Sequence, residues 1–207
     1  MERNDPEPDD RGSQRKHLRK ELRARRAAVS REVRATVVQH VRGALDGVIA
    51  ARNSAGLEPP KIAFYWPIHG ELSLVDLMKD VAGQELTVLL PVVTGPDEPL
   101  EFREWTRSTP MRRGAWNIPE PAEGKDVTPD VLLVPLVGFD ERRYRLGNGG
   151  GYYDRTLASR VPRPRAIGIG FEVLRLPTIH PEPHDVPMDL ILTEADPDLD
   201  RIASWWD

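Results

Sequence analysis

Cysteine is absent from the 207-residue sequence. Its absence excludes disulfide bonds, thiolate nucleophiles and cysteine zinc sites, and it favours a reducing compartment. Long hydrophobic runs are absent too, since no stretch approaches the roughly 20 apolar residues that span a bilayer. Residues 1–10 are acidic, unlike the basic and then apolar start of a secretory signal. We therefore expect a cytoplasmic protein with no membrane partner.

Charge of one sign dominates only one short part of the chain. The whole sequence has 29 Lys and Arg against 33 Asp and Glu, a net charge of −4, but residues 15–34 contain nine basic and two acidic residues. Nucleic acid is not favoured as a partner, because no aromatic side chain interleaves with these basic residues and the rest of the chain is acidic. A solvated helix face or a polyphosphate pocket explains the run.

Alternating apolar patterns predict an α/β fold after a flexible tail at residues 1–13. The length fits a single domain, residues 14–207. Helices are predicted at 14–28, at 31–51 after a Ser30 cap, at 73–82 with a capping box of Ser73 and Asp76, and from about Tyr152. Mostly continuous apolar runs predict strands at 62–66, 86–93, 100–105, 131–135, 166–170 and 190–192. Such alternation favours an open, mainly parallel sheet with helices on both faces.

A glycine-rich segment, Arg145-Leu-Gly-Asn-Gly-Gly-Gly-Tyr-Tyr-Asp-Arg155, follows a predicted strand and begins a predicted helix. Glycines let several N–H groups converge, and a helix N-terminus adds partial positive charge, so phosphate is the expected ligand. The segment is not a Walker A loop, which ends in Gly-Lys-Ser/Thr, and Tyr152 stands where a dinucleotide fingerprint needs its third glycine. A flexible surface turn is the alternative, but four glycines in five positions exceed what a turn needs.

Two acidic residues could hold a metal ion beside such a phosphate. Asp154 falls in the first turn of the predicted helix, and Asp189 precedes the last strand. If both lie at one sheet edge they suit Mg²⁺; taken alone, Asp154 is a helix-stabilising residue. The segment 180–185 holds two histidines and two acids in a proline-rich turn, where surface histidines are expected rather than zinc ligands.

Aromatic residues near a predicted strand end suggest a site for a flat ligand. Trp66 ends the first strand and Glu71 follows in the next loop, at the edge where open α/β sheets bind ligands. A heterocycle could stack on Trp66 and hydrogen-bond Glu71. Core packing is the alternative for Trp66 and for Trp116, which lies in Trp-Asn-Ile-Pro.

Six ordered blocks between about residues 15 and 195 resemble the 5-formyltetrahydrofolate cyclo-ligase (methenyltetrahydrofolate synthetase) family. They are Arg-x-x-Leu-Arg from Arg15, Glu71, Trp116–Pro119, Pro135–Asp140, the glycine segment through Arg155, and His184-Asp185 before Met188-Asp189. The resemblance implies a fold similar to those of sugar-phosphate isomerases and CoA transferases. It implies that 5-formyltetrahydrofolate and ATP are converted, with Mg²⁺, to 5,10-methenyltetrahydrofolate, ADP and phosphate.

The resemblance also implies residue roles, with no covalent nucleophile. Expected ATP-binding residues are Arg15, Lys16, Arg19, Arg145, Gly147, Asn148, Gly149, Gly150, Gly151, Tyr152 and Tyr153. Expected folate-binding residues are Trp66, Glu71, Trp116, Asn148 and Tyr152, and Asp154 and Asp189 are expected to hold Mg²⁺. We expect no partners other than these substrates, and we expect the protein to be a monomer.

Three positions depart from the family pattern. Arg15 stands where Lys is usual, unless Lys16 does its work; Asn148 replaces a commoner Tyr or Arg; and Gly150 stands where some members have Lys. We expect these differences to shift ATP affinity. Two other hypotheses are a sugar-phosphate isomerase, which needs an acid and a base but no ATP, and a nucleic-acid-binding or nucleotide-binding protein, whose affinity for nucleic acid would fall steeply with salt.

Overall fold

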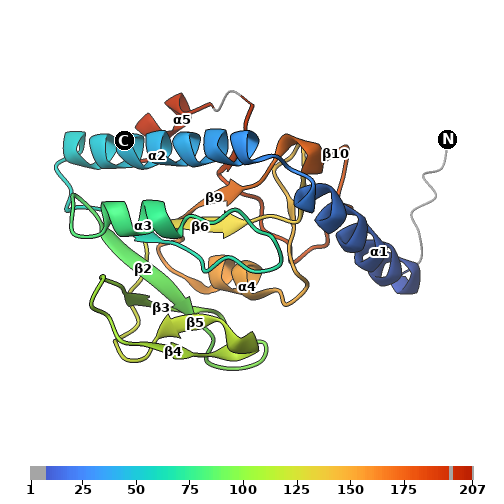
Figure 1. Ribbon diagram of the computed structural model, residues 1–207, viewed down its shortest axis with the longest axis horizontal. Coiled ribbons are helices and arrows are strands. Elements are labelled where there is room, and N and C mark those ends of the chain that lie inside the picture. The colour runs from blue at the N-terminus through green and yellow to red at the C-terminus, as the bar shows by residue number, and fades with distance from the viewer. Residues whose placement is uncertain (1–7, 196–197, 207) are drawn as a thin grey trace.

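The computed structural model describes residues 8–195 and 198–206, and a mostly parallel sheet lies at its centre (Figure 1). Its strands follow the order β11-β9-β6-β1-β2-β3, and only β3 is antiparallel to its neighbour. The bounds are β1 Lys61–Ala63, β2 Thr87–Val92, β3 Glu101–Glu104, β6 Val131–Pro135, β9 Arg165–Ile169 and β11 Leu190–Leu192. The predicted α/β fold with an open, mainly parallel sheet is confirmed.

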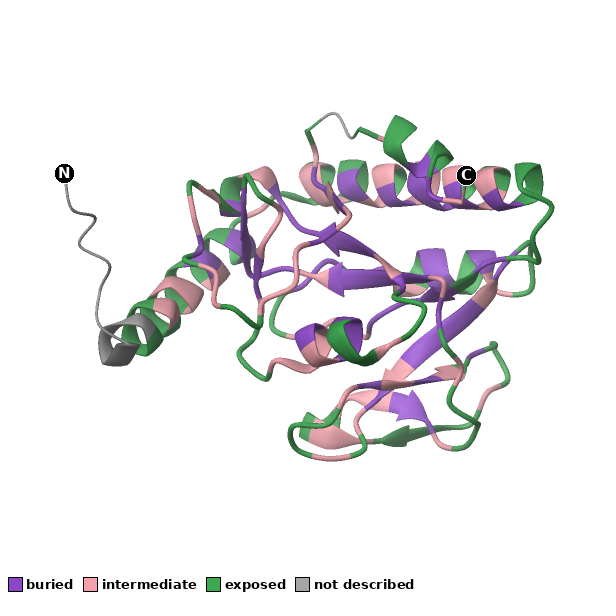
Figure 2. Ribbon diagram, turned by 180° about the vertical axis from the view of Figure 1, so that it is seen from behind, coloured by how far each residue is buried: buried purple, intermediate pink, exposed green. Residues whose placement is uncertain are grey.

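Helices cover both faces of this sheet. Helices α2 Arg31–Ser54 and α3 Val75–Val81 lie on one face, and α4 Tyr152–Ser159 lies on the other. Helix α5 Asp200–Ala203 packs against α2, and α1 Pro8–Ala27 lies to one side of the sheet (Figure 1). Strand side chains alternate between two cores, as period-two geometry requires. Leu133 belongs to the core under α2 and α3, whereas Leu132 and Val134 belong to the core under α4. Figure 2 shows the buried strands between these layers.

Smaller elements surround the sheet. One three-stranded sheet has the order β10-β7-β8, with β7 Gly138–Asp140, β8 Arg145–Leu146 and β10 Arg175–Leu176. A hairpin joins β4 Met111–Arg113 to β5 Pro119–Pro121 around the 3-10 helix η1 Ala115–Asn117, and η2 spans Glu172–Leu174. In Figure 1, α1 extends to one side of the molecule, next to the smaller sheet. The sequence patterns did not predict these short pieces.

Most predicted bounds differ little from those observed. Two predictions are wrong: the start of the first helix and the capping box at Ser73. Helix α1 begins at Pro8 rather than Gln14, so residues 8–13 of the predicted tail are helical, and residues 1–7 lie outside the described part. Ser30 caps α2 as predicted, by accepting a 3.3 Å hydrogen bond from Val33 N–H. The capping box at Ser73 is wrong, because α3 is preceded by Leu74 and has no side-chain cap.

Candidate active site

The glycine segment connects β8 to α4 and has the backbone that only glycine adopts easily. Gly149 has φ 107° and Gly151 has φ 66°. A methyl group at Gly151 would lie 2.7 Å from Nη1 of Arg155, and one at Gly149 would lie 3.5 Å from Cζ of Arg19. Residues 147–151, which we call the glycine loop, are therefore shaped by close approach to arginine side chains.

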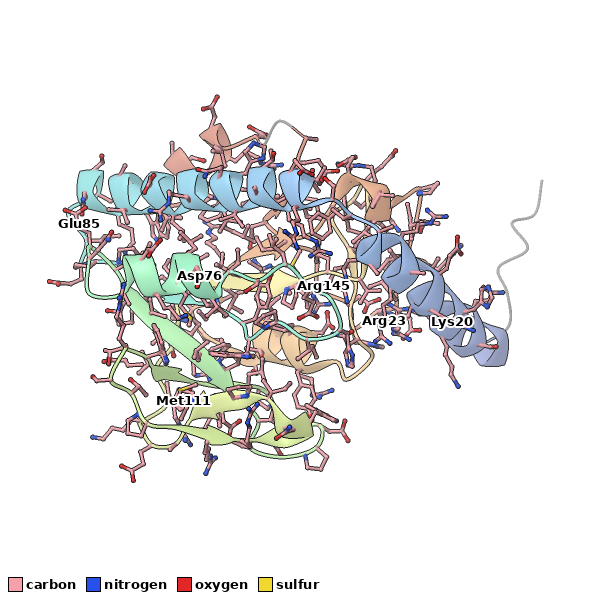
Figure 3. The ribbon with its side chains drawn as sticks, viewed as in Figure 1. Lys20, Arg23, Asp76, Glu85, Met111 and Arg145 are labelled. Atoms are coloured by element: carbon pink, nitrogen blue, oxygen red, sulfur yellow. The ribbon has the colours of Figure 1, made fainter. Side chains whose placement is uncertain are left out.

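Helix α1 brings its basic residues onto the glycine loop. Arg19 Nε donates to Gly147 O at 2.9 Å, and Arg23 Nη2 donates to Asn148 Oδ1 at 2.8 Å. Figure 3 shows Arg23 and Arg145 at the end of the molecule where α1 meets the sheet. Burial lowers the pKa of Arg19, and the charges of Arg15 and Arg23 lower it further. Crowded cations of this kind are relieved by a bound anion.

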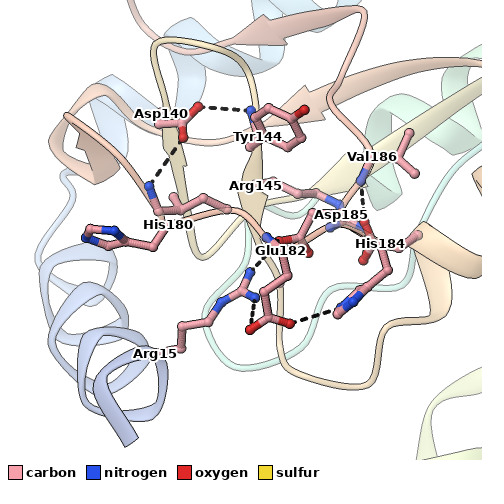
Figure 4. A network of polar contacts seen from close by, with 12 residues as sticks. Arg15, Asp140, Tyr144, Arg145, His180, Glu182, His184, Asp185 and Val186 are labelled. Carbon is pink, nitrogen blue, oxygen red and sulfur yellow. Dashed lines mark hydrogen bonds and ion pairs between the residues drawn. The ribbon is translucent and has the colours of Figure 1, made fainter. Parts of the chain in front are cut away.

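Arg15 lies nearer the N-terminus of the same helix and forms ion pairs with acidic residues of the 180–185 segment. Its guanidinium pairs with Glu182 at 3.0 Å and with Asp185 at 2.9 Å (Figure 4). Lys16, the alternative basic residue, is exposed. His180 and His184 are both exposed, as predicted for surface histidines.

A buried ion pair lies beneath the glycine loop. Arg145 Nη2 is 3.0 Å from Asp154 Oδ2, and both side chains are nearly inaccessible to solvent. Asp154 Oδ1 accepts a hydrogen bond from Val186 N–H at 3.1 Å. Arg145 Nε is buried without a partner among the described groups, and its guanidinium stacks 5.8 Å from the Tyr153 ring centre. Burial raises the pKa of Tyr153, so that hydroxyl stays protonated.

Asp189 lies elsewhere. Its Oδ2 accepts from Ala166 N–H at 2.7 Å, and its Oδ1 is 3.2 Å from Arg163. Ala166 is the second residue of β9 and pairs with Leu132, the second residue of β6, so Asp189 lies near the amino ends of these strands. The glycine loop instead contacts Glu71, which lies in the segment after the carboxyl end of β1, a parallel neighbour of β6. Asp154 thus pairs with Arg145 beside the loop, whereas Asp189 contacts arginines and a backbone N–H at the other end of the strands; the roles of both as magnesium ligands stay predictions.

Glu71 is joined to the glycine loop through Asn148. Asn148 Nδ2 donates to Glu71 Oε1 at 3.0 Å, and Ile68 N–H donates to Glu71 Oε2 at 3.0 Å. Burial raises the pKa of Glu71, although these hydrogen bonds and Arg26 oppose the rise. Asn148 thus contacts both Arg23 of α1 and a carboxylate at the predicted folate position.

The two tryptophans predicted to bind folate differ in exposure. Trp116 is 67% exposed and contacts Tyr152 edge-on, with ring centres 5.5 Å apart. It belongs to η1, where Trp116 and Asn117 both have positive φ. Because the Trp116 side chain is mostly exposed, the core-packing alternative is wrong for this residue. Trp66 is partly buried and packs against the core, which agrees with the structural alternative. The structure therefore brings Trp116 to Tyr152.

Sequence reasoning missed the importance of Arg26. Its side chain is 1% exposed; Nη1 donates to Leu136 O at 2.9 Å and Nη2 donates to His69 O at 2.8 Å. It therefore ties α1 to the chain after β6 and to the loop that carries Glu71. The available signal was its spacing of four residues from Leu22, which is fully buried in the core.

These features are typical of a class of protein, the α/β enzymes that act on phosphate-bearing ligands: a glycine loop lies against arginines of α1 and is joined through Asn148 to a buried carboxylate. The model of the 5-formyltetrahydrofolate cyclo-ligase family matches residues 11–194. The chain belongs to this family. It is an ATP-dependent ligase of folate one-carbon metabolism that converts 5-formyltetrahydrofolate to 5,10-methenyltetrahydrofolate.

Individual relatives agree. The chain is 34% identical to a 5-formyltetrahydrofolate cyclo-ligase of Haemophilus influenzae over 142 residues, 63% of this chain and 74% of the relative. It is 30% identical to one of Mycolicibacterium smegmatis, over 85% of this chain and 91% of the relative. The solved structure of an Aquifex aeolicus 5,10-methenyltetrahydrofolate synthetase matches with a TM-score of 0.65 and 30% identity, covering 88% of this chain and 91% of that one. No helix of the described residues could cross a membrane.

Proposed function

We propose that the triphosphate of ATP binds between α1 and the glycine loop, and that 5-formyltetrahydrofolate binds beside it at Glu71. The observation that supports this arrangement most is the bridge from Arg23 through Asn148 to Glu71. With this bridge, the predicted phosphate site and the predicted folate site are one side chain apart. Transfer of a phosphoryl group between two bound substrates needs such proximity.

For ATP, the proposed ligands are the guanidinium groups of α1 and the N–H groups of the loop. Arg19 already contacts the loop at Gly147 O, and its pKa is lowered by neighbouring cations, which an anion would compensate. Arg145 lies beneath the loop, where its charge acts over a short distance. Arg15 and Lys16 stay predicted phosphate ligands; Arg15 would have to be shared with Glu182 and Asp185.

For the folate, Glu71 is the proposed hydrogen-bond acceptor. A pterin N–H could replace Asn148 on Oε1, which would free the Asn148 amide to contact the formyl group or a phosphate. Trp116 and Tyr152 offer exposed ring surface beside the loop, on which a flat ring could stack. Trp66 stays a predicted contact at the strand end.

The proposed chemistry has two steps. The formyl oxygen of the substrate attacks the γ-phosphorus of ATP and ADP leaves, which gives an iminium-like formyl phosphate. N10 of the folate then attacks the formyl carbon, the ring closes, and phosphate leaves with its oxygen while N10 loses its proton. Arginines and loop N–H groups stabilise the charge on the transferred phosphoryl group. No covalent bond to the protein is required.

Magnesium is proposed as the metal. Bound Mg²⁺ would neutralise phosphate oxygens. Of the two predicted ligands, Asp154 is the one that lies next to the glycine loop, in the first turn of α4. Its Oδ2 would then be shared with Arg145. The assignment of Asp189 rests on the family resemblance alone.

The test follows methenyl-folate absorbance with 5-formyltetrahydrofolate, ATP and Mg²⁺. We expect product only when all three are present, and Arg19→Ala should raise the ATP KM or lower kcat about ten- to a hundredfold, as loss of a charge-assisted hydrogen bond implies. Arg25→Ala is the matched control, because Arg25 lies on the same helix, exposed and paired with Glu21. Equal ATP responses in the two variants would contradict the proposed phosphate site and favour the solvated-helix interpretation.

A further inference from the structure

A basic cleft of about 520 Å³ lies away from the glycine loop. Its wall includes Arg143, Arg163, Arg165, Asp189, Arg201 and Trp205. Arg165 is the first residue of β9 and pairs with Val131, the first residue of β6, so the cleft opens at the amino ends of these strands. The glycine loop contacts Glu71, which follows the carboxyl end of the parallel strand β1. The cleft is thus a separate place in the fold, and its size lies within the range of small-molecule sites, about 300–1,000 Å³.

Positive charge dominates the cleft. Four arginines line it, and Asp189 is the only acidic residue among the described lining residues. Asp189 contacts Arg163 at 3.2 Å and Arg165 at 3.6 Å, which balances one of these charges. Asp198 lies 3.9 Å from Arg201. Among the described residues, an excess of guanidinium charge therefore remains over the cleft.

The arginines come from separate segments and are held in place by the protein. Arg163 Nη2 donates to Pro187 O at 3.1 Å, Arg143 Nε donates to Met188 O at 3.0 Å, and Arg165 Nη2 donates to Trp205 O at 2.9 Å. Arg165 also stacks 5.8 Å from the Trp205 ring centre. Such anchoring reduces the side-chain entropy lost when a ligand binds.

Hydrogen-bonding capacity remains after these contacts. A guanidinium has five N–H donors, and the bonds to the carbonyl groups and to Asp189 use only part of them. Its planar fork matches the oxygens of phosphate and carboxylate groups. A purely structural role would explain how the arginines anchor residues 186–189 and Trp205, but it would not require four of them to line one open cleft.

We propose that this basic cleft binds a small multivalent anion of the phosphate or polycarboxylate class. No residue of the glycine loop lines the cleft, but one short segment, residues 186–189, lines the cleft and also contacts the proposed reaction site. Val186 N–H contacts Asp154 beneath the glycine loop, whereas Pro187 O and Asp189 contact Arg163 in the cleft. An anion that competes with Asp189 for Arg163 acts directly on this segment.

The experiment is a calorimetric titration of the full chain saturated with ATP, so that the glycine loop is occupied. Inorganic phosphate and tricarballylate are the two probes. We expect at least one to bind in the millimolar range or tighter, and its identity distinguishes a phosphate-bearing from a polycarboxylate ligand. Arg163→Gln/Arg201→Gln should weaken that binding at least tenfold.

Two further variants keep the result decisive. Arg201→Gln alone removes a cleft charge whose contact with the Asp198 carboxylate is long, at 3.9 Å, so a folded protein with binding weakened about threefold or more is expected. Arg42→Gln removes an exposed arginine of α2 that pairs with Asp80, and it should bind the probe as the parent does. The proposal is overturned if neither probe binds the parent, or if folded Arg201→Gln and the double variant bind with the parent's affinity.

Discussion

At the scale of single residues, Glu71 connects stability to pH. Its folded pKa is raised by burial, so between its ordinary value and the raised value the folded protein binds more protons than the unfolded chain. Stability is then highest below the ordinary pKa and falls as pH rises through the folded pKa. As pH rises from the ordinary pKa of Glu71 to its raised pKa, we expect the unfolding free energy of the parent to fall relative to that of Glu71→Gln. Urea denaturation at several pH values measures this difference.

The same variant tests the folate site. Glu71→Gln keeps the shape of the side chain but loses its charge, so a charge-assisted hydrogen bond to the pterin weakens. We expect the KM for 5-formyltetrahydrofolate to rise about ten- to a hundredfold, with the KM for ATP changed much less. A variant whose only change is in the ATP KM would place Glu71 outside the folate pocket.

The two predicted magnesium ligands, Asp154 and Asp189, give a further prediction at the scale of single residues. Asp154→Asn should raise the Mg²⁺ concentration needed for half-maximal rate at least tenfold, because it removes the carboxylate charge beside the loop. Asp189→Asn should lower the melting temperature, since Arg163, Arg165 and Ala166 N–H lose their charged acceptor. Titrating Mg²⁺ in both variants decides their roles: an unchanged requirement in Asp154→Asn removes it from the metal site, and a raised requirement in Asp189→Asn keeps it there.

At the scale of elements, the glycine loop can be tested against a turn of the same backbone angle. Gly151 and Gly56 both have φ 66°, but a methyl group at Gly56 would meet nothing within 4 Å. Alanine at either position is strained by about 1 kcal/mol or more. We expect Gly151→Ala and Gly149→Ala to lose ATP binding by calorimetry while folded by circular dichroism, and Gly56→Ala to bind normally. Folded loop variants with parental ATP affinity would move the nucleotide site elsewhere.

Helix α1 depends on Arg26 for its position. Lysine at this site can keep one of the two carbonyl contacts, so Arg26→Lys should cost about 1.5–3 kcal/mol of unfolding free energy. Because Arg26 links α1 to the Glu71 loop, the KM values of both substrates should rise at a temperature where the variant is folded. Arg25→Ala serves as the control on the same helix. Parental KM values in Arg26→Lys would limit Arg26 to stability.

The longer elements could be predicted because their signals are local. Apolar runs marked β2, β6 and β11 within one or two residues, and Ser30 marked the start of α2. The strands of the small sheet escaped notice because they have two or three residues each and depend on partners far along the chain. Ser73 failed as a cap because α3 begins only at Val75.

At the scale of the whole molecule, the components of the site were predictable but their contacts were not. The glycine loop, Arg19 and Glu71 stood out by composition and by family resemblance. Their meeting depends on contacts between residues 128 positions apart for Arg19 and Gly147, and 77 apart for Asn148 and Glu71. The sequence also could not predict at which end of the sheet Asp189 lies, because that position depends on strand order and register.

The described chain also predicts one cooperative unfolding transition. Its two cores share the strands of a single sheet, so neither can be lost alone. We expect the calorimetric and van't Hoff enthalpies of thermal unfolding to agree. A calorimetric enthalpy well above the van't Hoff enthalpy would show that parts of the chain unfold separately, which would contradict the predicted single domain.

The strand order has a consequence during synthesis on the ribosome. β1 pairs with β2 soon after it emerges, but its other neighbour is β6, which comes 68 residues after the end of β1 at Ala63. β6 must in turn wait for β9, and the nascent chain meanwhile exposes an apolar strand edge that favours wrong pairing. The hazard therefore persists until β9 and then β11, near the end of the chain, have emerged and completed the sheet.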